Sequence, residues 1–183
     1  MHPAIFLDRD GVIIENRPAY VRSWEDVEIF PQALTALARV CKSPYKIVIV
    51  TNQSGVGRGL IQMETAEEIN RRLVREIEKA GGRIDAVLMC PHAPEDRCGC
   101  RKPLPGLFFQ AARQLQIELS RSVMIGDAVS DLQAGKAGGI PRRFLVRTGR
   151  GAIQENLPEI AAAGPFTPCD TLEEALSRIL LDP

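Results

Sequence analysis

The sequence predicts an α/β fold with a doubly wound parallel sheet. Short apolar runs rich in β-branched residues occur at about 4–8, 46–51, 84–89, 122–126 and 143–147. Runs of this length that end at polar or turn residues are typical of buried parallel strands. Helical patterns alternate with these runs, at about 31–42, 64–80, 105–117, 130–138 and 171–181. Strands that alternate with helices form βαβ units, and such units build a parallel sheet covered by helices.

Two of the helices carry recognisable boundary signals. Thr65 and Glu68 have the spacing of a capping box at the start of the helix at 64–80, and Gly81-Gly82 ends its pattern. Thr171 and Glu174 repeat the spacing at the last helix. One apolar face is expected on each helix, made by Ile69, Leu73 and Ile77 on the first and by Leu172, Ala175, Ile179 and Leu180 on the last.

Length and composition favour a single globular domain over residues 1–183. The chain is 45% hydrophobic and 25% charged, which are ordinary values for such a domain. Its 23 Lys and Arg residues balance 23 Asp and Glu residues, so no overall field attracts nucleic acid or an anionic membrane. Neither a signal-peptide pattern nor a long apolar stretch is present. We therefore expect a cytoplasmic monomer with no nucleic-acid or membrane partner.

Four polar segments follow the predicted strands or a Cys-rich loop. They are Asp8-Arg9-Asp10-Gly11, Thr51-Asn52-Gln53-Ser54-Gly55, Arg101-Lys102-Pro103 and Gly126-Asp127. In an open parallel sheet, ligands bind outside the carboxyl ends of the strands. Each segment alone has an ordinary structural explanation, such as a turn, a loop, a solvated charge or a helix N-cap. Together, and in this order, they predict one site for phosphoryl transfer.

The acidic residues of these segments predict a magnesium site and a nucleophile. Asp8 and Asp10, two residues apart, point the same way if the chain stays extended. Like charges this close need a cation, and Mg²⁺ suits carboxylates and phosphate, with Asp127 as a third ligand. Asp8 is the expected nucleophile, which forms an aspartyl phosphate. Asp10 is the expected acid that protonates the leaving alkoxide and the base that then activates water.

The remaining polar residues are expected to hold the phosphate. The hydroxyl group of Thr51 and the backbone amides of the Thr51-Asn52-Gln53 turn are predicted to bind nonbridging oxygens. Lys102 offers a compact positive charge beside them. The predicted catalytic residues are therefore Asp8, Asp10, Thr51 and Lys102, with Asn52 and Gln53 as substrate-binding residues.

Cysteine and histidine spacing predicts a zinc loop over residues 90–103. Cys90, His92, Cys98 and Cys100 supply the four N and S ligands that a closed tetrahedral Zn²⁺ site requires. The alternative is two buried thiols and an unrelated surface histidine. Cys41 and Cys169 each stand alone and are expected to be small buried or half-buried side chains.

The segment 11–30 is long for a connection between a strand and a helix. Its aromatic residues Tyr20 and Trp24, with Arg22, suit a flap over the predicted site. They equally suit a surface loop whose aromatic side chains pack onto the domain. The sequence leaves both alternatives open.

These segments together resemble the haloacid dehalogenase (HAD) superfamily of aspartate-nucleophile phosphatases. Asp8-Arg9-Asp10-Gly11-Val12 matches its first motif and Thr51 its second, while Lys102 and Asp127 match the third and fourth. The fuller strings Cys90-Pro91-His92 and Cys98-Gly99-Cys100-Arg101-Lys102-Pro103 narrow the likeness to the heptose-bisphosphate and histidinol-phosphate phosphatase family.

The resemblance implies an uncapped HAD core, dependent on Mg²⁺, in which a structural zinc loop replaces the cap domain. It implies that Arg101 binds the far end of a small phosphorylated sugar. The expected reaction is removal of the 7-phosphate from D-glycero-D-manno-heptose 1,7-bisphosphate in the supply of heptose for lipopolysaccharide. Two alternatives stay open, namely a histidinol-phosphate phosphatase and a catalytically silent binding module whose zinc loop docks a partner.

Overall fold

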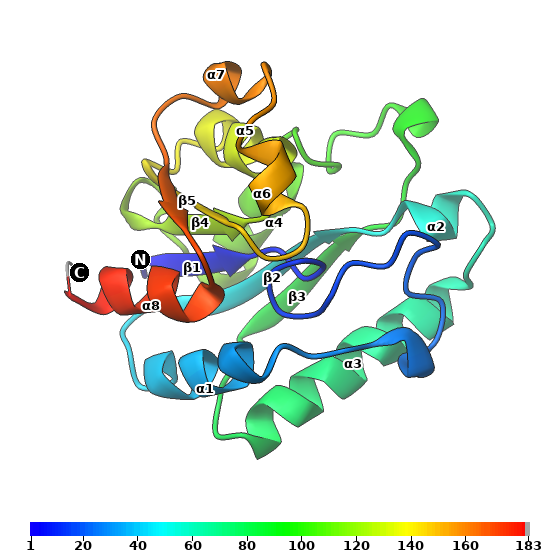
Figure 1. The fold of residues 1–183 in the computed structure, drawn as a ribbon, viewed down its shortest axis with the longest axis horizontal. Helices are drawn as coiled ribbons and strands as arrows, with labels where there is room; N and C mark the ends of the chain where they lie inside the picture. Colours follow the sequence, from blue (N-terminus) through cyan, green and yellow to red (C-terminus); the bar gives the residue numbers. More distant parts are fainter. Residues whose placement is uncertain (182–183) are drawn as a thin grey trace.

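The computed structural model describes residues 1–181 and contains a six-stranded parallel sheet (Figure 1). The strand order is β3-β2-β1-β4-β5-β6, and every neighbouring pair is parallel. The strands are β1 (Ala4–Leu7), β2 (Lys46–Asn52), β3 (Ala86–Cys90), β4 (Val123–Gly126), β5 (Arg142–Val146) and β6 (Thr167–Cys169). The order reverses at β1, so β1 lies centrally between β2 and β4.

Helices cover both faces of this sheet (Figure 1). One face carries α1 (Pro31–Val40), α3 (Met63–Lys79) and α8 (Leu172–Leu181). The opposite face carries α4 (Gly106–Leu115) and α5 (Val129–Ala137). Short helices are α2 (Ser54–Gly57), α6 (Gly151–Gln154) and α7 (Ile160–Ala163), and 3₁₀ turns occur at Trp24–Asp26, Pro94–Asp96 and Leu119–Arg121.

The central strand explains why the predicted runs are apolar throughout. Ile5 and Leu7 of β1 pack into the core on the α1, α3 and α8 face. Ala4 and Phe6 point into the opposite core, where the ring of Phe6 meets the edge of Phe108 at a centroid distance of 4.9 Å. A strand buried on both faces has no polar position to alternate with.

The predicted fold class and its five strands and five long helices are confirmed. Strand β6 was not predicted, because Thr167-Pro168-Cys169 is very short and contains a proline. Proline cannot donate to a ladder, and it is tolerated here since β6 is an edge strand. The single-domain prediction for 1–183 stays a prediction, and its last two residues lie outside the described part.

The boundary signals were only partly right. Helix α3 begins at Met63 with Gln62 as N-cap, so Thr65 lies inside the first turn and the predicted capping box at Thr65 is wrong. At α8, the amide of Glu174 does donate to the hydroxyl of Thr171 at 3.2 Å. The Glu174 carboxylate accepts instead from the amide of Asp170, at 2.7 Å.

The predicted apolar faces need one correction. Ile69, Leu73 and Ile77 of α3 are buried, as expected. On α8, Leu180 is 41% exposed and Leu176 takes the expected buried place. Cys41 is half-buried and Cys169 buried, which confirms their predicted packing. No helix within residues 1–181 is long and apolar enough to cross a membrane.

Candidate active site

A cleft of about 610 Å³ opens at the carboxyl ends of the central strands. It is lined by residues that follow β1 and β2, by the Arg101-Lys102-Pro103 segment and by the start of α5. The predicted residues that line it are Asp8, Asp10, Asn52, Gln53, Arg101 and Lys102. The parallel sheet therefore brings three of the four polar segments to one cleft, and the fourth lies just beneath it.

Three buried carboxylates form an acidic cluster at the floor of this cleft. Side-chain oxygens of Asp8, Asp127 and Asp131 lie within 4.8 Å of one another. Asp8 and Asp127 were predicted for this place, whereas Asp131 was not. The carboxylate of Asp10 does not join the cluster, which differs from the predicted Asp8-Asp10 pair. The position of the Asp10 carboxylate gives no support to its predicted role as a side-chain ligand of Mg²⁺.

Lys102 is the cation that holds two of these acids together. Its ammonium group donates to Asp8 Oδ1 at 2.8 Å and to the carbonyl oxygen of Val50 at 2.8 Å. It forms an ion pair with Asp131 Oδ1 at 2.6 Å. An ammonium group has three donors, so these three acceptors use all of them. Lys102 therefore holds Asp8 and Asp131 together and neutralises part of the negative charge of the acidic cluster.

Burial and mutual repulsion make the acidic cluster electrostatically unusual. Desolvation, opposed by Lys102 and reinforced by Asp131 and Asp10, raises the pKa of Asp8 to about 6. Desolvation likewise raises the pKa of Asp127 and of Asp131. The pKa of Lys102 is also raised, because the attraction of Asp131 and Asp8 outweighs its own desolvation. Such perturbed carboxylates in a cleft are characteristic of functional sites.

Asp127 is held by the loops that follow β1 and β5. Asn16 donates its side-chain amide to Asp127 Oδ2 at 2.6 Å, and the backbone amide of Arg150 donates to the same oxygen at 2.9 Å. The Arg150 guanidinium lies 3.5 Å from Asp127 Oδ1. Gly11, with φ of +83°, approaches so closely that a Cβ atom there would overlap the Asp127 carboxylate. The turn after β1 therefore requires glycine at this position.

Asp10 also lines the cleft and has its own set of donors. Arg9 donates to both of its oxygens, from Nε to Oδ2 at 3.0 Å and from Nη2 to Oδ1 at 3.1 Å. Gln53 Nε2 donates to Asp10 Oδ2 at 2.9 Å and to Thr51 Oγ1 at 2.8 Å. The Thr51 hydroxyl lies 3.5 Å from Asp10 Oδ2. Gln53 thus connects the predicted acid and base to the end of β2.

Asn52 and Arg101 hold the segment that carries Lys102. The Asn52 side chain donates to the carbonyl of Lys102 at 3.0 Å and accepts from the amide of Lys102 at 3.1 Å. Arg101 donates to the carbonyl of His92 at 3.3 Å while its side chain lines the cleft. The predicted substrate-binding side chain of Asn52 is therefore occupied in positioning the backbone of Lys102.

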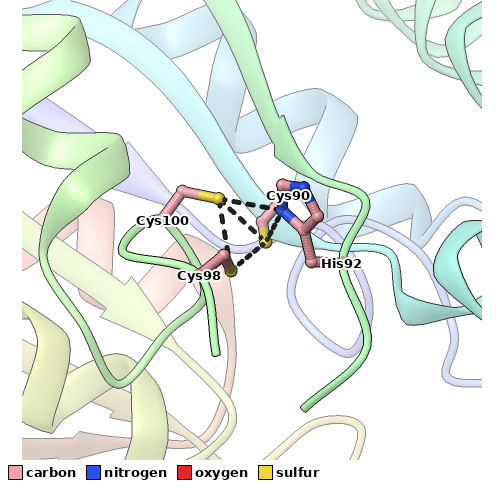
Figure 2. A group of neighbouring side chains, drawn as sticks. All are labelled: Cys90, His92, Cys98 and Cys100. Atoms are coloured by element: carbon pink, nitrogen blue, oxygen red, sulfur yellow. Dashed lines mark hydrogen bonds between the residues drawn. The ribbon is translucent and has the colours of Figure 1, made fainter. Parts of the chain in front are cut away.

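The four predicted zinc ligands form a second cluster (Figure 2). The sulfur atoms of Cys90, Cys98 and Cys100 are separated by 3.1 to 3.5 Å. His92 Nδ1 lies 3.6 Å from the sulfur of Cys90 and 3.4 Å from that of Cys100. All three thiols are free, so no disulfide competes. The separations approach the edge length, about 3.8 Å, of a tetrahedron with Zn–S bonds near 2.3 Å, so the donor set fits Zn²⁺.

The cluster of Cys and His residues contacts the end of β2 through backbone hydrogen bonds. The amide of Gln53 donates to the carbonyl of Cys90 at 2.7 Å, and the amide of Gly57 donates to the carbonyl of Pro91 at 2.8 Å. Burial raises the pKa of the Cys90 thiol. Burial also tends to raise the pKa of the Cys98 thiol. Hydrogen bonds from the Arg101 backbone and the neighbouring thiols outweigh this effect and lower the pKa to about 7.

The donor set of the acidic cluster fits Mg²⁺. Carboxylate oxygens are the ligands that this hard cation prefers, and Asp8, Asp127 and Asp131 supply one each. Burial, and behind it the repulsion of neighbouring carboxylates, raises the pKa of all three acids, and a bound cation would favour their ionised forms. The open side of the cluster faces the cleft, where further ligands from water or phosphate have room.

The loop at 11–30 both packs down and borders the cleft. Val12, Ile13, Ile14 and Val21 are buried in the core. The guanidinium of Arg72 lies over the face of the Trp24 ring, 4.5 Å from its centroid, in a cation–π contact. Between these anchors, residues 16–18 and 20 line the cleft. The loop thus combines features of both alternatives.

The polar side chains of this site that sequence reasoning missed include Arg9, Asn16, Asp131 and Arg150. Asp131 had a usable signal, because it lies four residues after Asp127 at the start of a helical pattern. Arg9 stands between two predicted site residues, but nothing in the sequence shows that its side chain is buried. Asn16 and Arg150 belong to loops whose course the sequence does not reveal.

Comparisons with known proteins agree with this geometry. A family model described as HAD-hydrolase-like matches residues 99–175. The chain is 42% identical over 159 residues to D-glycero-beta-D-manno-heptose-1,7-bisphosphate 7-phosphatase of Bordetella bronchiseptica, which covers 85% of this chain and 88% of that protein. It is 36% identical to the protein of the same name from Pseudomonas putida, over 85% of this chain and 89% of the other.

Solved structures give the same picture. The crystal structure of D,D-heptose 1,7-bisphosphate phosphatase from B. bronchiseptica, complexed with magnesium and phosphate, matches with a TM-score of 0.90 and 35% identity over 99% of both chains. The crystal structure of D,D-heptose 1,7-bisphosphate phosphatase from Burkholderia thailandensis matches with a TM-score of 0.71 and 31% identity, over 97% of this chain and 98% of the other. The likeness therefore extends over nearly the whole length of the chain.

Proposed function

The chain belongs to the D-glycero-beta-D-manno-heptose-1,7-bisphosphate 7-phosphatase family of HAD-like hydrolases, and on that premise we propose that it removes the 7-phosphate of this sugar bisphosphate. The proposed reaction depends on Mg²⁺ and belongs to the supply of heptose precursors for lipopolysaccharide. The observation that carries the proposal is the acidic cluster of Asp8, Asp127 and Asp131 beneath an open cleft.

Asp8 is the proposed nucleophile, and its hydrogen bonds support this role. Lys102 holds Asp8 Oδ1, and within residues 1–181 no hydrogen bond is recorded to Oδ2. Oδ2 is therefore free to form a bond to phosphorus while Lys102 keeps the carboxylate in place. The bond between phosphorus and the oxygen on C7 of the sugar breaks, its electron pair stays on that oxygen, and the phosphoryl group becomes an acyl phosphate on Asp8.

Asp10 is the proposed proton donor and acceptor. Its proton passes to the sugar oxygen as the alcohol leaves, and Asp10 afterwards takes a proton from the water molecule that attacks the aspartyl phosphate. Inorganic phosphate and the regenerated Asp8 carboxylate are the products. Mg²⁺, held by Asp8, Asp127 and Asp131, would supply positive charge for the transferring phosphoryl group. Zn²⁺, held by the four Cys and His residues, would supply rigidity to the loop that carries Lys102.

A cationic rim supports a substrate with a second anionic group. Arg17, Arg101 and Arg150 all line the cleft, around the acids on its floor. One phosphate of the substrate approaches Asp8, so the other must find its partner on this rim. Arg101 is the proposed partner, since it directly follows Cys100, the last proposed zinc ligand, and stands next to Lys102 in the chain. We also propose that the chain acts as a monomeric cytoplasmic domain on this small sugar phosphate.

The test is turnover of the bisphosphate with Mg²⁺, followed by ³¹P NMR. We expect the signal of the C7 phosphate to be replaced by inorganic phosphate, while the anomeric phosphate signal remains. Histidinol phosphate and an aryl phosphate, assayed in parallel, should give much lower kcat/KM values. A higher kcat/KM for histidinol phosphate, or loss of the anomeric phosphate instead, would contradict the proposed substrate.

The role of Arg101 has a matched test. Arg101→Ala should lower kcat/KM for the bisphosphate, because it removes a charge-assisted hydrogen bond that stabilises the transition state by about 1.5–3 kcal/mol. The kcat/KM for the aryl phosphate should stay unchanged. The control is Arg97→Asn, which removes an exposed arginine of the same loop and keeps a residue that tolerates the left-handed backbone at φ of +48°. Equal losses on both substrates would place Arg101 outside the distal-phosphate site.

A further inference from the structure

Arg9 is a charged side chain that is almost completely buried. It is only 1% exposed, and it is the largest of the fully buried side chains among the described residues. Its Nε and Nη2 atoms donate to Asp10, at 3.0 and 3.1 Å, and its Nη1 donates to Asn70 Oδ1 at 2.8 Å. Asn70 lies on α3, is itself buried and contacts the sulfur of Met89 through Nδ2 at 3.7 Å. A chain of contacts thus runs from α3 through Arg9 to Asp10.

Burying this guanidinium is costly for the fold. Removing an ion from water costs several kcal/mol, and an ion pair recovers this only with good geometry and satisfied donors. Within residues 1–181, Asp10 is the only carboxylate recorded in an ion pair with Arg9. The geometry is the planar, two-point contact that arginine makes with a carboxylate. What the arrangement fixes most firmly is the orientation of Asp10.

We infer that Arg9, held in turn by Asn70, is a positioning residue that sets the orientation of the Asp10 carboxylate for proton transfer. This inference rests on the proposed phosphatase function. Arg9 does not line the cleft, so it acts through Asp10 and not on the substrate. Lysine cannot replace it, because an ammonium group cannot make the same two-point contact and reach Asn70 as well.

The contacts also select one oxygen of Asp10. Oδ2 accepts from Arg9 Nε and from Gln53 Nε2, and the Thr51 hydroxyl lies 3.5 Å away. Oδ1 accepts from Arg9 Nη2 alone among the described residues. A carboxylate oxygen has two lone-pair sites. Oδ1 therefore keeps a free site and is the atom that passes the proton to the leaving alkoxide and later receives one from water.

The test compares two phosphate esters that differ in their need for a proton. An alkyl phosphate requires protonation of its leaving oxygen, whereas nitrophenolate leaves without it. Arg9→Met, which keeps the stem and removes the guanidinium, should lower kcat/KM for the alkyl phosphate by about tenfold or more. The same variant should change kcat/KM for nitrophenyl phosphate by less than about threefold. The reason is that kcat/KM reports only the steps up to departure of the leaving group, and nitrophenolate departs without a proton.

Two further variants separate positioning from mere stability. Asn70→Asp keeps Arg9 buried and charged but adds a competing carboxylate, so it should reproduce the selective loss on the alkyl ester. Arg9→Lys should not restore the wild-type ratio of the two kcat/KM values. Arg71→Gln is the matched control, because Arg71 neighbours Asn70 on α3 but is exposed and paired with Glu68, and it should leave both substrates unaffected.

The outcomes distinguish this inference from the proposed function. Equal losses on both esters, or no loss beyond a lower Tm, would show that Arg9 is only a structural ion pair and overturn the inference. A wild-type protein that hydrolyses neither ester would refute the proposed function itself. A wild-type protein active on some alkyl phosphate other than the heptose bisphosphate would still allow the Arg9 comparison.

Discussion

The molecule contains two clusters of potential metal ligands that are built in different ways. Protein cations contact the acidic cluster of Asp8, Asp127 and Asp131. Lys102 pairs with Asp8 and Asp131, and Arg150 lies beside Asp127. The cluster of Cys and His residues is linked by contacts among its own members and by backbone amides. Protein cations balance part of the charge of the acidic cluster. We expect the cluster of Cys and His residues to depend instead on a bound metal ion.

This difference separates activity from folding. Losing Mg²⁺ should remove the charge needed for phosphoryl transfer and leave the fold intact, because Lys102 and Arg150 still hold the carboxylates. Losing Zn²⁺ should loosen the loop at 90–103, which contains Lys102. The hydrogen bonds between the Asn52 side chain and the Lys102 backbone should then weaken, and Lys102 should be displaced. Removing Mg²⁺ with a chelator should therefore abolish activity, whereas removing Zn²⁺ should also lower stability. Four changes test this difference, from the largest expected effect to the smallest.

Asp8→Asn should have the largest effect on activity and almost none on the fold. Removing the nucleophilic charge should lower kcat on the order of 10⁴-fold or more for every phosphate ester. The melting temperature of the Mg²⁺-free protein should stay the same or rise, because one charge leaves a crowded acidic cluster. Steady-state kinetics and thermal melts measure both. A large drop in Tm would show that the acidic cluster is structural.

Lys102→Met should damage both activity and stability. Its loss leaves Asp8 and Asp131 without their shared cation, which for a buried pair costs about 3–5 kcal/mol. The misplaced nucleophile should lower kcat roughly a hundredfold or more. Lys79→Met is the control, since it removes an exposed ion pair with Glu76 and should change neither quantity measurably. Full activity in Lys102→Met would refute the assigned role.

Cys98→Ser should act mainly on stability. Removing one thiolate from a closed site should release zinc, and the Tm should fall by about 2–4 °C for each kcal/mol lost. Metal analysis of wild-type protein should give about one zinc per chain. Cys41→Ser, at a half-buried thiol outside the cluster, should keep the metal. Full zinc content in Cys98→Ser would contradict the assignment of the ligands.

The smallest effect is a pH dependence confined to the acidic cluster. The pKa of Asp8 in the folded protein is about 6, above its ordinary value of 3.8, so the folded state binds more protons between these values. Stability of the Mg²⁺-free protein should therefore fall as the pH rises from about 4 to about 6. Mg²⁺ needs the ionised carboxylates, so its stabilising effect should grow over the same window. Thermal melts with and without Mg²⁺ measure it, and an effect independent of pH would be contrary to this account.

The sequence predicted the parts of the site that follow strands directly. Asp8, Thr51 and Asp127 are fixed by the strand ends, which the apolar runs mark clearly. The orientation of Asp10 was not predictable, because the chain leaves the extended path at Arg9, whose carbonyl accepts from the amide of Ile13 at 2.9 Å. The Asp10 carboxylate therefore contacts Arg9 and Gln53 and does not join the cluster of Asp8, Asp127 and Asp131. The burial of Arg9 depends on α3, which is remote in sequence.

The zinc loop was predictable for a different reason. Its four ligands are close in sequence, so their spacing alone brings them together once a metal ion binds. The cations of the acidic cluster come from distant segments, and only the folded chain shows that Lys102 spends all three of its donors on protein oxygens. Local spacing carries information about chelation, and tertiary packing carries information about electrostatic balance.

The most direct test of the account is the identity of the phosphorylated residue. Asp10→Asn should still be phosphorylated by nitrophenyl phosphate, because nitrophenolate needs no proton, but should hydrolyse the acyl phosphate slowly. Rapid mixing should release about one nitrophenolate per active site in a burst. Borohydride reduction of the quenched protein should then convert residue 8 to homoserine, detectable by mass spectrometry of the peptide. Reduction at another carboxylate such as Asp131, or neither a burst nor a reduced residue, would contradict Asp8 as the nucleophile.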